Sequence, residues 1–501
     1  MLHPTPNMGL ALLSRPFGIT RQVRVGSSVH LVLRRSYMRA SDPKIGIRSS
    51  STQVTVADAI ESKPIQPLVA PKRHPIPGFP LSSLDNTSLL RSLLIAVVSS
   101  NKFLLLPALH ALSFLSKPTG GFLLDVDRNP LLHGILKKTF YDQFCAGETA
   151  EQTKACVNHL KSLGFRGVIL TYAKETVFDH ESQSAHEHGK KSEVDVFSNA
   201  KSVRLDPDID AWRLGTLETA DQIGEGDILA VKLTGAGTAV TSAFAADKAL
   251  PSQMIEALDE IAASCKRRRI RLIVDAESQK YQKAIDRVTV DLMRKFNRDG
   301  YAAIYNTYQA YLKATGANIN SHLAEASKDG FTLGLKLVRG AYILSDNRAL
   351  IHDTKQDTDD AYNSISQGAL KQHIGEFGDT RPFPSLELFL ASHNRDSLLA
   401  ALRLHQERVQ EHKPTVNVSF GQLHGMSDEV SFSLLQETKQ GAVGPGVFKC
   451  STWGSMSECL AYLVRRAVEN RDAVLRTTEE YAALKRETWR RIKTIFGGVA
   501  A

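Results

Sequence analysis

The sequence predicts an α/β protein, a (β/α)8 TIM-like barrel with an N-terminal helical extension. From Thr149 onward, short runs rich in Val, Ile and Leu alternate with longer stretches whose apolar residues recur at helical spacing. Runs that are apolar throughout are typical of parallel strands buried on both faces, and eight of them match a closed barrel. A doubly wound open sheet is the alternative. The expected strands are 167–172, 228–233, 270–275, 302–306, 333–338, 386–391, 415–420 and 442–448.

The first 41 residues hold six arginines and no lysine, aspartate or glutamate. Arginine and serine interleaved with apolar residues, without an unbroken apolar core, are the composition of a mitochondrial transit peptide. A disordered tail is the alternative. These residues also carry six of the nine net positive charges of the chain, so the basic character gives little support for nucleic-acid binding. We expect a transit peptide over 1–41 and a polar, proline-containing linker over 42–83.

An apolar tract follows between residues 84 and 115. Arg91 and Lys102 cut it into uncharged runs shorter than the roughly 20 residues that a membrane-spanning helix needs. We therefore expect two helices in an N-terminal helical region over 84–148. They either pack as ordinary core helices, which we favour, or lie along a membrane surface.

The barrel is expected over 149–476 and a C-terminal helix over 477–501. A polar insert at 177–215 interrupts the alternation and carries three histidines, for which a solvated loop is the favoured interpretation and a metal site the alternative. The five cysteines show no CxxC or CxH spacing, so the sequence predicts no metal site.

Polar side chains follow the predicted strands, and in a barrel the chemistry sits at these carboxyl ends. Lys232 ends the second apolar run and Asp275 ends the third, so Asp275 can supply the counter-charge of a buried Lys232. A Schiff-base lysine is the alternative, but it needs a lowered ammonium pKa, which an adjacent aspartate opposes. We expect an ion pair that is structural or orients a substrate.

A helix expected near the C-terminus carries Arg465 and Arg466. Glu469 lies three and four residues further on, so it can hold one guanidinium while the other stays available. A guanidinium binds a carboxylate through two parallel hydrogen bonds. A solvated basic helix face is the alternative. Apolar residues at helical spacing between 458 and 468 favour a helix with one buried face.

The fifth expected strand ends with Lys336, Arg339 and Gly340. A glycine allows a flat ligand to approach the backbone, and positive charge beside a flavin would stabilise its anionic reduced ring. No GxGxxG or GxxxxGK[ST] motif occurs at a strand-to-helix turn, so a Rossmann nicotinamide site or a P-loop is not supported.

Six segments carry a resemblance to a known family. They are VDAE at 274–277, YNTYQAYLK at 305–313, KLVRGAY at 336–342, SHN at 392–394, FGQLHGM at 420–426 and YLVRRAVEN at 462–470. In this order they resemble proline dehydrogenase, above all the mitochondrial, fungal-type enzymes, and the resemblance extends over residues 140–476.

The resemblance implies an FAD-dependent barrel that oxidises L-proline to Δ1-pyrroline-5-carboxylate, the first step of proline catabolism. Hydride would pass to flavin N5 and the electrons to a membrane quinone, on the matrix side of the mitochondrial inner membrane. Carried over, the catalytic positions are Lys232, Asp275, Tyr342, Arg465 and Arg466, the substrate contacts are Lys232, Leu337, Tyr342, Cys450, Arg465 and Arg466, and the flavin contacts are Gln309, Lys336, Arg339, Gly340, Ala341, Thr358, His393, Asn394, Gln422 and Glu469.

Three positions depart from the family's pattern. Cys450 stands where the family usually has a tyrosine that packs against the substrate, Lys336 where many bacterial members have arginine, and Asp346 where glutamate is usual. Because members with a smaller residue at the first position accept hydroxyproline, a hydroxyproline dehydrogenase is an alternative. A catalytically silent, membrane-associated homologue and a different flavin or Schiff-base barrel are further alternatives.

Overall fold

The computed structural model describes residues 76, 78–117, 121–173, 205–438, 444–469 and 474–496, without the side chains of 102, 468, 469, 474–478 and 496. Contacts divide the chain into two units, Met1–Leu68 and Val69–Ala501, and every described residue belongs to the second. The predicted transit peptide, most of the linker and most of the polar insert lie outside the described residues.

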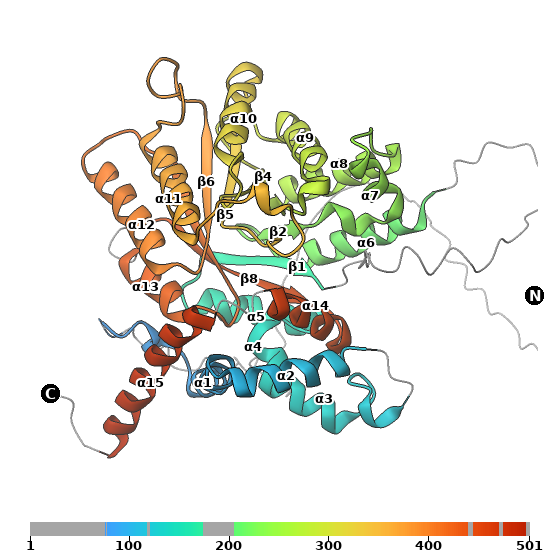
Figure 1. Cartoon of the computed structure of the whole chain (residues 1–501), viewed down its shortest axis with the longest axis vertical. Coiled ribbons are helices and arrows are strands. Elements are labelled where there is room, and N and C mark those ends of the chain that lie inside the picture. The colour runs from blue at the N-terminus through green and yellow to red at the C-terminus, as the bar shows by residue number, and fades with distance from the viewer. Residues whose placement is uncertain are drawn as a thin grey trace, which may run out of the picture. The chain divides into compact units, whose positions relative to one another are not determined.

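Eight parallel strands form a closed barrel in chain order, and the last strand pairs with the first (Figure 1). This arrangement confirms the (β/α)8 prediction and excludes the open sheet. The strands are β1 (Gly167–Tyr172), β2 (Ile228–Val231), β3 (Arg271–Val274), β4 (Ile304–Gln309), β5 (Leu333–Val338), β6 (Leu386–Ala391), β7 (Asn417–Leu423) and β8 (Gly446–Trp453).

Helices surround the barrel and connect its strands (Figure 1). The first of these begins inside the insert at 177–215, part of which is therefore helical rather than loop. Asp206 caps this helix by accepting from the backbone of Asp208, and Pro207 occupies its first turn. The helices are α6 (Pro207–Asp221), α7 (Thr238–Ala245), α8 (Ser252–Arg267), α9 (Gln279–Phe296), α10 (Thr315–Asp329), α11 (Lys355–Lys371), α12 (Arg395–Gln410), α13 (Asp428–Thr438) and α14 (Met456–Glu469).

The last strand starts later than predicted and continues to Trp453. The expected run stopped at Phe448, the residue before Lys449. A lysine is compatible with a buried strand when a partner neutralises its charge. The Lys449 side chain is 2% exposed, and its ammonium donates to the Asp428 carboxylate at 2.7 Å. This ion pair with α13 allows β8 to carry Cys450 to the carboxyl end of the barrel.

The interior of the barrel is filled by side chains rather than by a channel. At its amino-terminal end, Arg271 and the Tyr305 hydroxyl both donate to the Glu387 carboxylate, at 2.9 and 2.6 Å. The next layer is apolar and consists of Ile169, Ile273, Phe389 and Phe448. Ligands therefore have room only at the carboxyl end of the strands.

A helical extension precedes the barrel. It confirms the two helices expected in the apolar tract, which meet at Asn101. Among the described residues no single helix has the length and composition of a membrane span. The elements are a 3-10 turn (η1, Pro80–Ser83), α1 (Asn86–Ser100), α2 (Lys102–Leu115), a 3-10 turn (η2, Phe122–Leu124), α3 (Pro130–Leu136), a π-helical turn (η3, Lys137–Tyr141), α4 (Asp142–Phe144) and α5 (Ala150–Ser162).

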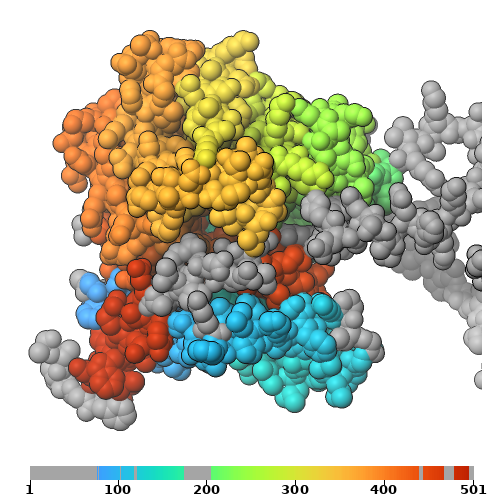
Figure 2. All heavy atoms as spheres, in the orientation of Figure 1, coloured from blue at the N-terminus to red at the C-terminus, as the bar shows by residue number. Residues whose placement is uncertain are grey.

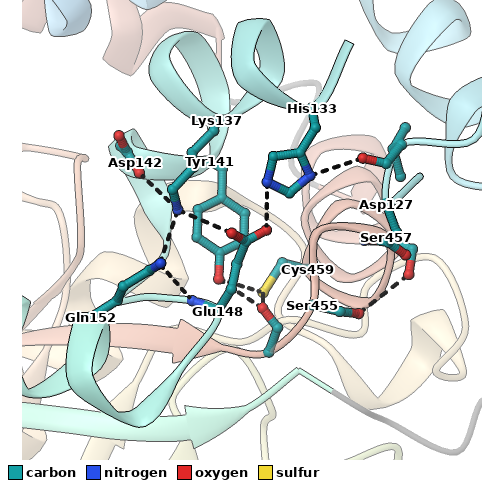
Figure 3. A network of polar contacts seen from close by, with 12 residues as sticks. Asp127, His133, Lys137, Tyr141, Asp142, Glu148, Gln152, Ser455, Ser457 and Cys459 are labelled. Carbon is teal, nitrogen blue, oxygen red and sulfur yellow. Dashed lines mark hydrogen bonds and ion pairs between the residues drawn. The ribbon is translucent and has the colours of Figure 1, made fainter. Parts of the chain in front are cut away.

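The extension packs on the C-terminal helices. Helix α1 lies against α15 (Val474–Phe496), which begins three residues before the expected C-terminal helix, and α2 lies against α14. Polar contacts fix this arrangement (Figure 3). The Glu148 carboxylate binds both Lys137 and His133 at 3.2 Å, and the Tyr141 hydroxyl donates to the Gly454 carbonyl at 2.7 Å. The extension is thus joined directly to the loop that precedes α14.

Candidate active site

Two charged side chains point from neighbouring parts of the barrel into its carboxyl end. The Lys336 ammonium of β5 donates to the Asp275 carboxylate, which follows β3, at 2.6 Å. Their side chains are 11% and 27% exposed, so water screens the pair only partly. Asp275 therefore binds Lys336 and not Lys232, which corrects the predicted ion pair. The sequence analysis considered only the strand next to the one that Asp275 follows. It did not consider that Lys336 of β5 also points into the barrel at the same height.

Lys232 lies near the helix that carries the two arginines. Its ammonium is 6.0 Å from the centroid of the Tyr462 ring, and the Arg466 guanidinium is 5.7 Å from the same centroid. Both distances are within the range of cation–π attraction. The structure thus brings together the predicted carboxylate-binding residues Lys232, which follows β2, and Arg466, which lies on α14. The Tyr462 ring lies near the charged groups of both.

Cys450 faces this group of charges from β8. Burial raises the pKa of its thiol to about 11, while the nearby ammonium groups of Lys336 and Lys232 lower it and Asp275 raises it. The thiol is therefore neutral at physiological pH. Lys336, Asp275 and Lys232 all lie close enough to influence its charge, so Cys450 belongs to the same end of the barrel as these residues.

Arg339, just after β5, is bound on every side. Its Nε donates to Asp359 at 2.7 Å, its Nη1 to the Ser392 hydroxyl at 2.6 Å and its Nη2 to the Ser397 hydroxyl at 3.0 Å. The guanidinium also lies 4.3 Å from the centroid of the Tyr362 ring. Arg339 consequently joins β5, α11 and the loop after β6 and adds a fixed positive charge to this edge of the barrel.

The loop after Arg339 is shaped by a glycine and an aspartate. Gly340 has a φ of 147°, and a Cβ at this position would lie 2.4 Å from the Tyr311 ring, so no other residue fits. The Asp346 carboxylate accepts from the Tyr311 hydroxyl, the Ser278 hydroxyl and the Gln279 amide, each at 2.9 Å. Asp346 therefore ties the loop after β5 to the loop that carries Asp275.

Gln309 at the end of β4 links the same loops. Its side-chain amide donates to the Glu277 carbonyl and accepts from the Ala341 amide, both at 3.2 Å. The Glu277 carboxylate in turn accepts from the amide and the hydroxyl of Thr234, after β2. The loops after β2, β3, β4 and β5 thus form one hydrogen-bonded rim around the Lys336–Asp275 pair.

The geometry can be compared with known proteins. The sequence model of the family described as proline dehydrogenase matches residues 153–479 of the chain. The chain belongs to the proline dehydrogenase family. It is 29% identical over 459 residues to the probable mitochondrial proline dehydrogenase of Schizosaccharomyces pombe, an alignment that covers 83% of this chain and 91% of that protein.

Other members of the proline dehydrogenase family differ in the substrate that their names state. The chain is 30% identical over 401 residues to hydroxyproline dehydrogenase of Bos taurus, covering 72% of this chain and 82% of that protein. It is 34% identical over 247 residues to human mitochondrial proline dehydrogenase 1, covering 48% and 39%. The comparisons therefore include relatives of both names.

The fold also matches a solved structure of proline utilization A. The protein from Bdellovibrio bacteriovorus, inactivated by N-propargylglycine, superposes with a TM-score of 0.54 at 16% identity, over 77% of this chain. The match covers 38% of the other protein, so the chain spans about two fifths of its length. At this identity the likeness supports the barrel fold alone.

Several residues that resemble flavin-contacting positions of the proline dehydrogenase family hold loops in place. The Asn394 side chain caps α12 by accepting from the Ser397 amide at 3.0 Å. Gln422 donates to the Ser392 carbonyl at 3.3 Å and accepts from the Ser431 hydroxyl at 3.0 Å. His393 Nδ1 lies 2.7 Å from the Ser427 hydroxyl. These contacts fix the loop after β6 against β7 and α13.

The remaining predicted positions lie at different depths. Leu337 is fully buried and belongs to the apolar core between the barrel and its helices, opposite in direction to Lys336, so its contact with a substrate stays a prediction from the resemblance alone. Thr358 is in the first turn of α11, and Tyr342 is half-buried after Gly340. Arg465 precedes Arg466 on α14. The side chain of Glu469 lies outside the described residues.

Sequence reasoning missed two residues of this site. Tyr462 belongs to a segment that carries the resemblance but was given no role, although its spacing of four residues from Arg466 places both on one face of a helix. Asp346 was noted as a substitution, and its three hydrogen bonds join segments that are distant in sequence.

No group of three or more His, Cys, Asp or Glu side chains in the described part of the chain is placed to bind a metal.

Proposed function

We propose that this chain is a flavin-dependent dehydrogenase that oxidises L-proline to Δ1-pyrroline-5-carboxylate and delivers the electrons to a membrane quinone. The observation that carries the proposal is the shared Tyr462 ring, which holds the cations of Lys232 and Arg466 together beside the Lys336–Asp275 pair. Two cations of this kind at the end of a barrel suit a small carboxylate.

The carboxylate of proline would bind Arg466 and Lys232, with Arg465 as a further partner from the same helix. A carboxylate held by a planar guanidinium has a defined orientation, and orientation is a large part of what an enzyme contributes to hydride transfer. The apolar ring of proline would then extend toward Cys450, whose neutral thiol presents no charge to it. In this reading Lys336, bound to Asp275, acts on the cofactor side of the site.

The residues present fit FAD, which when bound supplies the two-electron acceptor. Lys336 and the fixed guanidinium of Arg339 place positive charge at the end of β5, where a reduced anionic ring needs it. A cavity of about 290 Å³ between α11 and α12 is lined by Asp359, Asn394 and Ser397, next to Arg339. Its polar lining suits the nucleotide half of a long cofactor.

No side chain in the described residues is assigned as a general base. The substrate amine would lose its proton to solvent before hydride transfer, and the residues named above would orient the amine and its ring. The relatives named mitochondrial support a mitochondrial location, and the matrix side of the inner membrane is the finer part of the proposal. Tyr342, Ala341, His393 and Thr358 keep their proposed places around substrate and cofactor.

A second candidate is oxidation of hydroxyproline. Cys450 is smaller than the tyrosine usual in the family and would leave space beside the substrate ring. Several relatives, among them those of Bos taurus and Homo sapiens, are named hydroxyproline dehydrogenase. The extra hydroxyl group of that substrate would occupy this space. The two candidates share every other residue of the site, so only a comparison of substrates distinguishes them.

The test is anaerobic bleaching of the flavin in the purified chain, titrated in parallel with L-proline and trans-4-hydroxy-L-proline. Bleaching by proline at the lower concentration is the expected result. Preference for hydroxyproline would assign the second candidate, and bound flavin that neither compound bleaches would overturn both in favour of a catalytically silent homologue. The Cys450→Tyr variant is the matched control for pocket size, and we expect it to disfavour hydroxyproline further.

A further inference from the structure

Exposed apolar side chains are concentrated in the helical extension. More than half of the large apolar side chains that are exposed in the described residues lie between Ile76 and Ile135. Soluble proteins seldom present many such side chains close together unless the surface has a partner. In Figure 2 the blue to cyan spheres of this extension lie at the lower edge of the view, away from the yellow and orange barrel helices.

Helix α2 is apolar around most of its circumference. Ten of its fourteen residues are Phe, Leu or Ala, yet only Leu109 is buried. One face, with Leu112 and Leu115, packs against the cluster that includes Leu460 of α14. The opposite face exposes Phe103 at 90% and Phe114 at 54%. A core helix would bury these rings, so this apolar face of α2 has no partner among the residues that the structure describes.

The two helices of the apolar tract do not form one straight helix. They meet at an angle of 104°, because the Asn101 side chain caps α2 by accepting from the Phe103 amide at 2.9 Å. Taken together they have the apolar composition of a span, but each alone is too short to cross a bilayer. Their composition with this geometry suits helices that lie along an interface.

The charges of the segment favour a lipid surface over a second copy of the chain. From Asn86 to Leu136, a range that includes η2 and α3, the sequence contains four basic residues, Arg91, Lys102, Lys117 and Arg128, against two acidic residues, Asp125 and Asp127. Lys117 is exposed at the end of α2. Cations beside an apolar face complement anionic lipid headgroups, whereas a symmetric contact between two copies would bring like charges together.

We propose that α2, η2 and α3 form a docking surface for the interface of an anionic lipid bilayer. Its apolar side chains would enter the boundary between headgroups and acyl chains without crossing the membrane. We call it the lipid-docking surface, and it consists of the exposed side chains Phe103, Leu106, Phe114, Leu123, Leu131 and Ile135.

The lipid-docking surface is held firmly to the rest of the described chain. The other face of α2 packs on α14, and the Ser457 amide of α14 donates to Asp127, which precedes α3, at 3.2 Å (Figure 3). A bilayer bound to this surface would therefore lie near the helix that carries Arg465 and Arg466. That this proximity serves electron transfer to a lipid-dissolved quinone rests on the proposed function, whereas the docking itself does not.

The test is flotation of the full chain with vesicles of phosphatidylcholine, with and without phosphatidylglycerol. We expect binding that is stronger with the anionic lipid. The double variant Phe103→Glu and Leu123→Glu should lower the vesicle partition coefficient by about tenfold or more. In the bound state, two charges would replace apolar side chains that enter the bilayer. The matched control is Ile255→Glu with Val409→Glu, two apolar residues of α8 and α12 with exposures of 43% and 51%.

Equal vesicle binding of the double variant and the wild type would overturn the proposal. So would a loss of self-association in the double variant with no change in vesicle binding. As a second readout, the fluorescence of Phe103→Trp should shift to shorter wavelength on addition of anionic vesicles, and an unchanged spectrum would also contradict the proposal. Bleaching by proline in vesicle-free buffer should be the same for all variants, so a failure of docking and a failure of the proposed function can be told apart.

Discussion

Lys232 and Arg466 share one aromatic ring, that of Tyr462, with their charged groups 6.0 and 5.7 Å from its centroid. Cation–π attraction to a shared ring favours one position for each charged group. The ring thereby keeps the two side chains close to one another. Tyr462 is therefore a positioning residue for the proposed substrate site.

Replacement of Tyr462 by leucine should raise the proline KM by about tenfold, because cation–π contacts of roughly 1 to 2 kcal/mol are lost. Tyr462→Phe keeps the ring and should change KM much less. Steady-state kinetics of both variants distinguish the ring from the hydroxyl. Equal KM values for Tyr462→Leu and the wild type would show that the ring does not position the cations.

Arg466→Ala should raise the proline KM on the order of 100-fold, since charge-assisted hydrogen bonds to a carboxylate contribute roughly 1.5 to 3 kcal/mol. Arg466→Lys retains the charge without the planar fork and should give an intermediate KM. The thermal unfolding temperature should change little in either variant. Arg403→Ala on α12, with a side chain 67% exposed, is the control that should leave KM unchanged. An unaltered KM in Arg466→Ala would contradict the carboxylate assignment.

Asp346→Ala should destabilise the loops around the site, because one buried and two partly buried hydrogen bonds lose their acceptor. With about 1 kcal/mol for each bond, we expect a loss of roughly 3 kcal/mol in the free energy of unfolding. Urea denaturation measures it. Asp346→Glu, which restores the residue usual in the family, should retain most of the stability, and a loss as large as that of Asp346→Ala would show that the shorter side chain is required.

Glu480 on α15 gives a stability that depends on pH. Its carboxylate accepts from the Asp428 amide at 3.1 Å, and burial, with Asp428 nearby, raises its pKa from 4.5 to about 7. The folded chain therefore binds this proton more tightly than the unfolded chain, so the contribution of Glu480 to stability is lost as pH rises from 4.5 to about 7. Glu480→Gln cannot titrate and should flatten the dependence of the unfolding temperature on pH between 5 and 8.

The neighbouring Glu479 provides the matched control, since it is exposed on the same helix. Glu479→Gln should leave the pH dependence of the wild type in place. If Glu480→Gln and Glu479→Gln unfold with the same pH profile as the wild type, the carboxylate of Glu480 is not the group that responds.

The alternation of apolar runs and helices predicted the barrel because parallel strands buried on both faces leave a pattern that is local in sequence. The pattern failed where a polar residue is buried with a distant partner. Lys449 ended the expected strand too early because its partner, Asp428, lies on another element. Likewise the start of α6 depends on the cap formed by Asp206, which a count of polar residues does not reveal.

The site could be predicted in its residue types but only partly in its pairing. Positions at the ends of strands indicated Lys232 and Asp275 as a pair and Lys336 as a neighbour of the flavin. The lysine that binds Asp275 is determined by the curvature of the barrel and by α14, because Tyr462 of α14 lies beside Lys232. Local spacing in the sequence reveals neither the curvature nor the position of α14. Arg339 and Gln422 show the same limit, because their contacts with Ser392 join segments more than 25 residues apart.

The closed floor of the barrel, where Arg271 and Tyr305 bind Glu387, has a consequence for traffic through the site. No molecule can pass along the barrel axis, so whatever enters at the carboxyl end must leave by the same opening. Substrate and product then compete for one entrance and cannot occupy it together. Release of the oxidised product through this opening must therefore precede the arrival of the next substrate molecule.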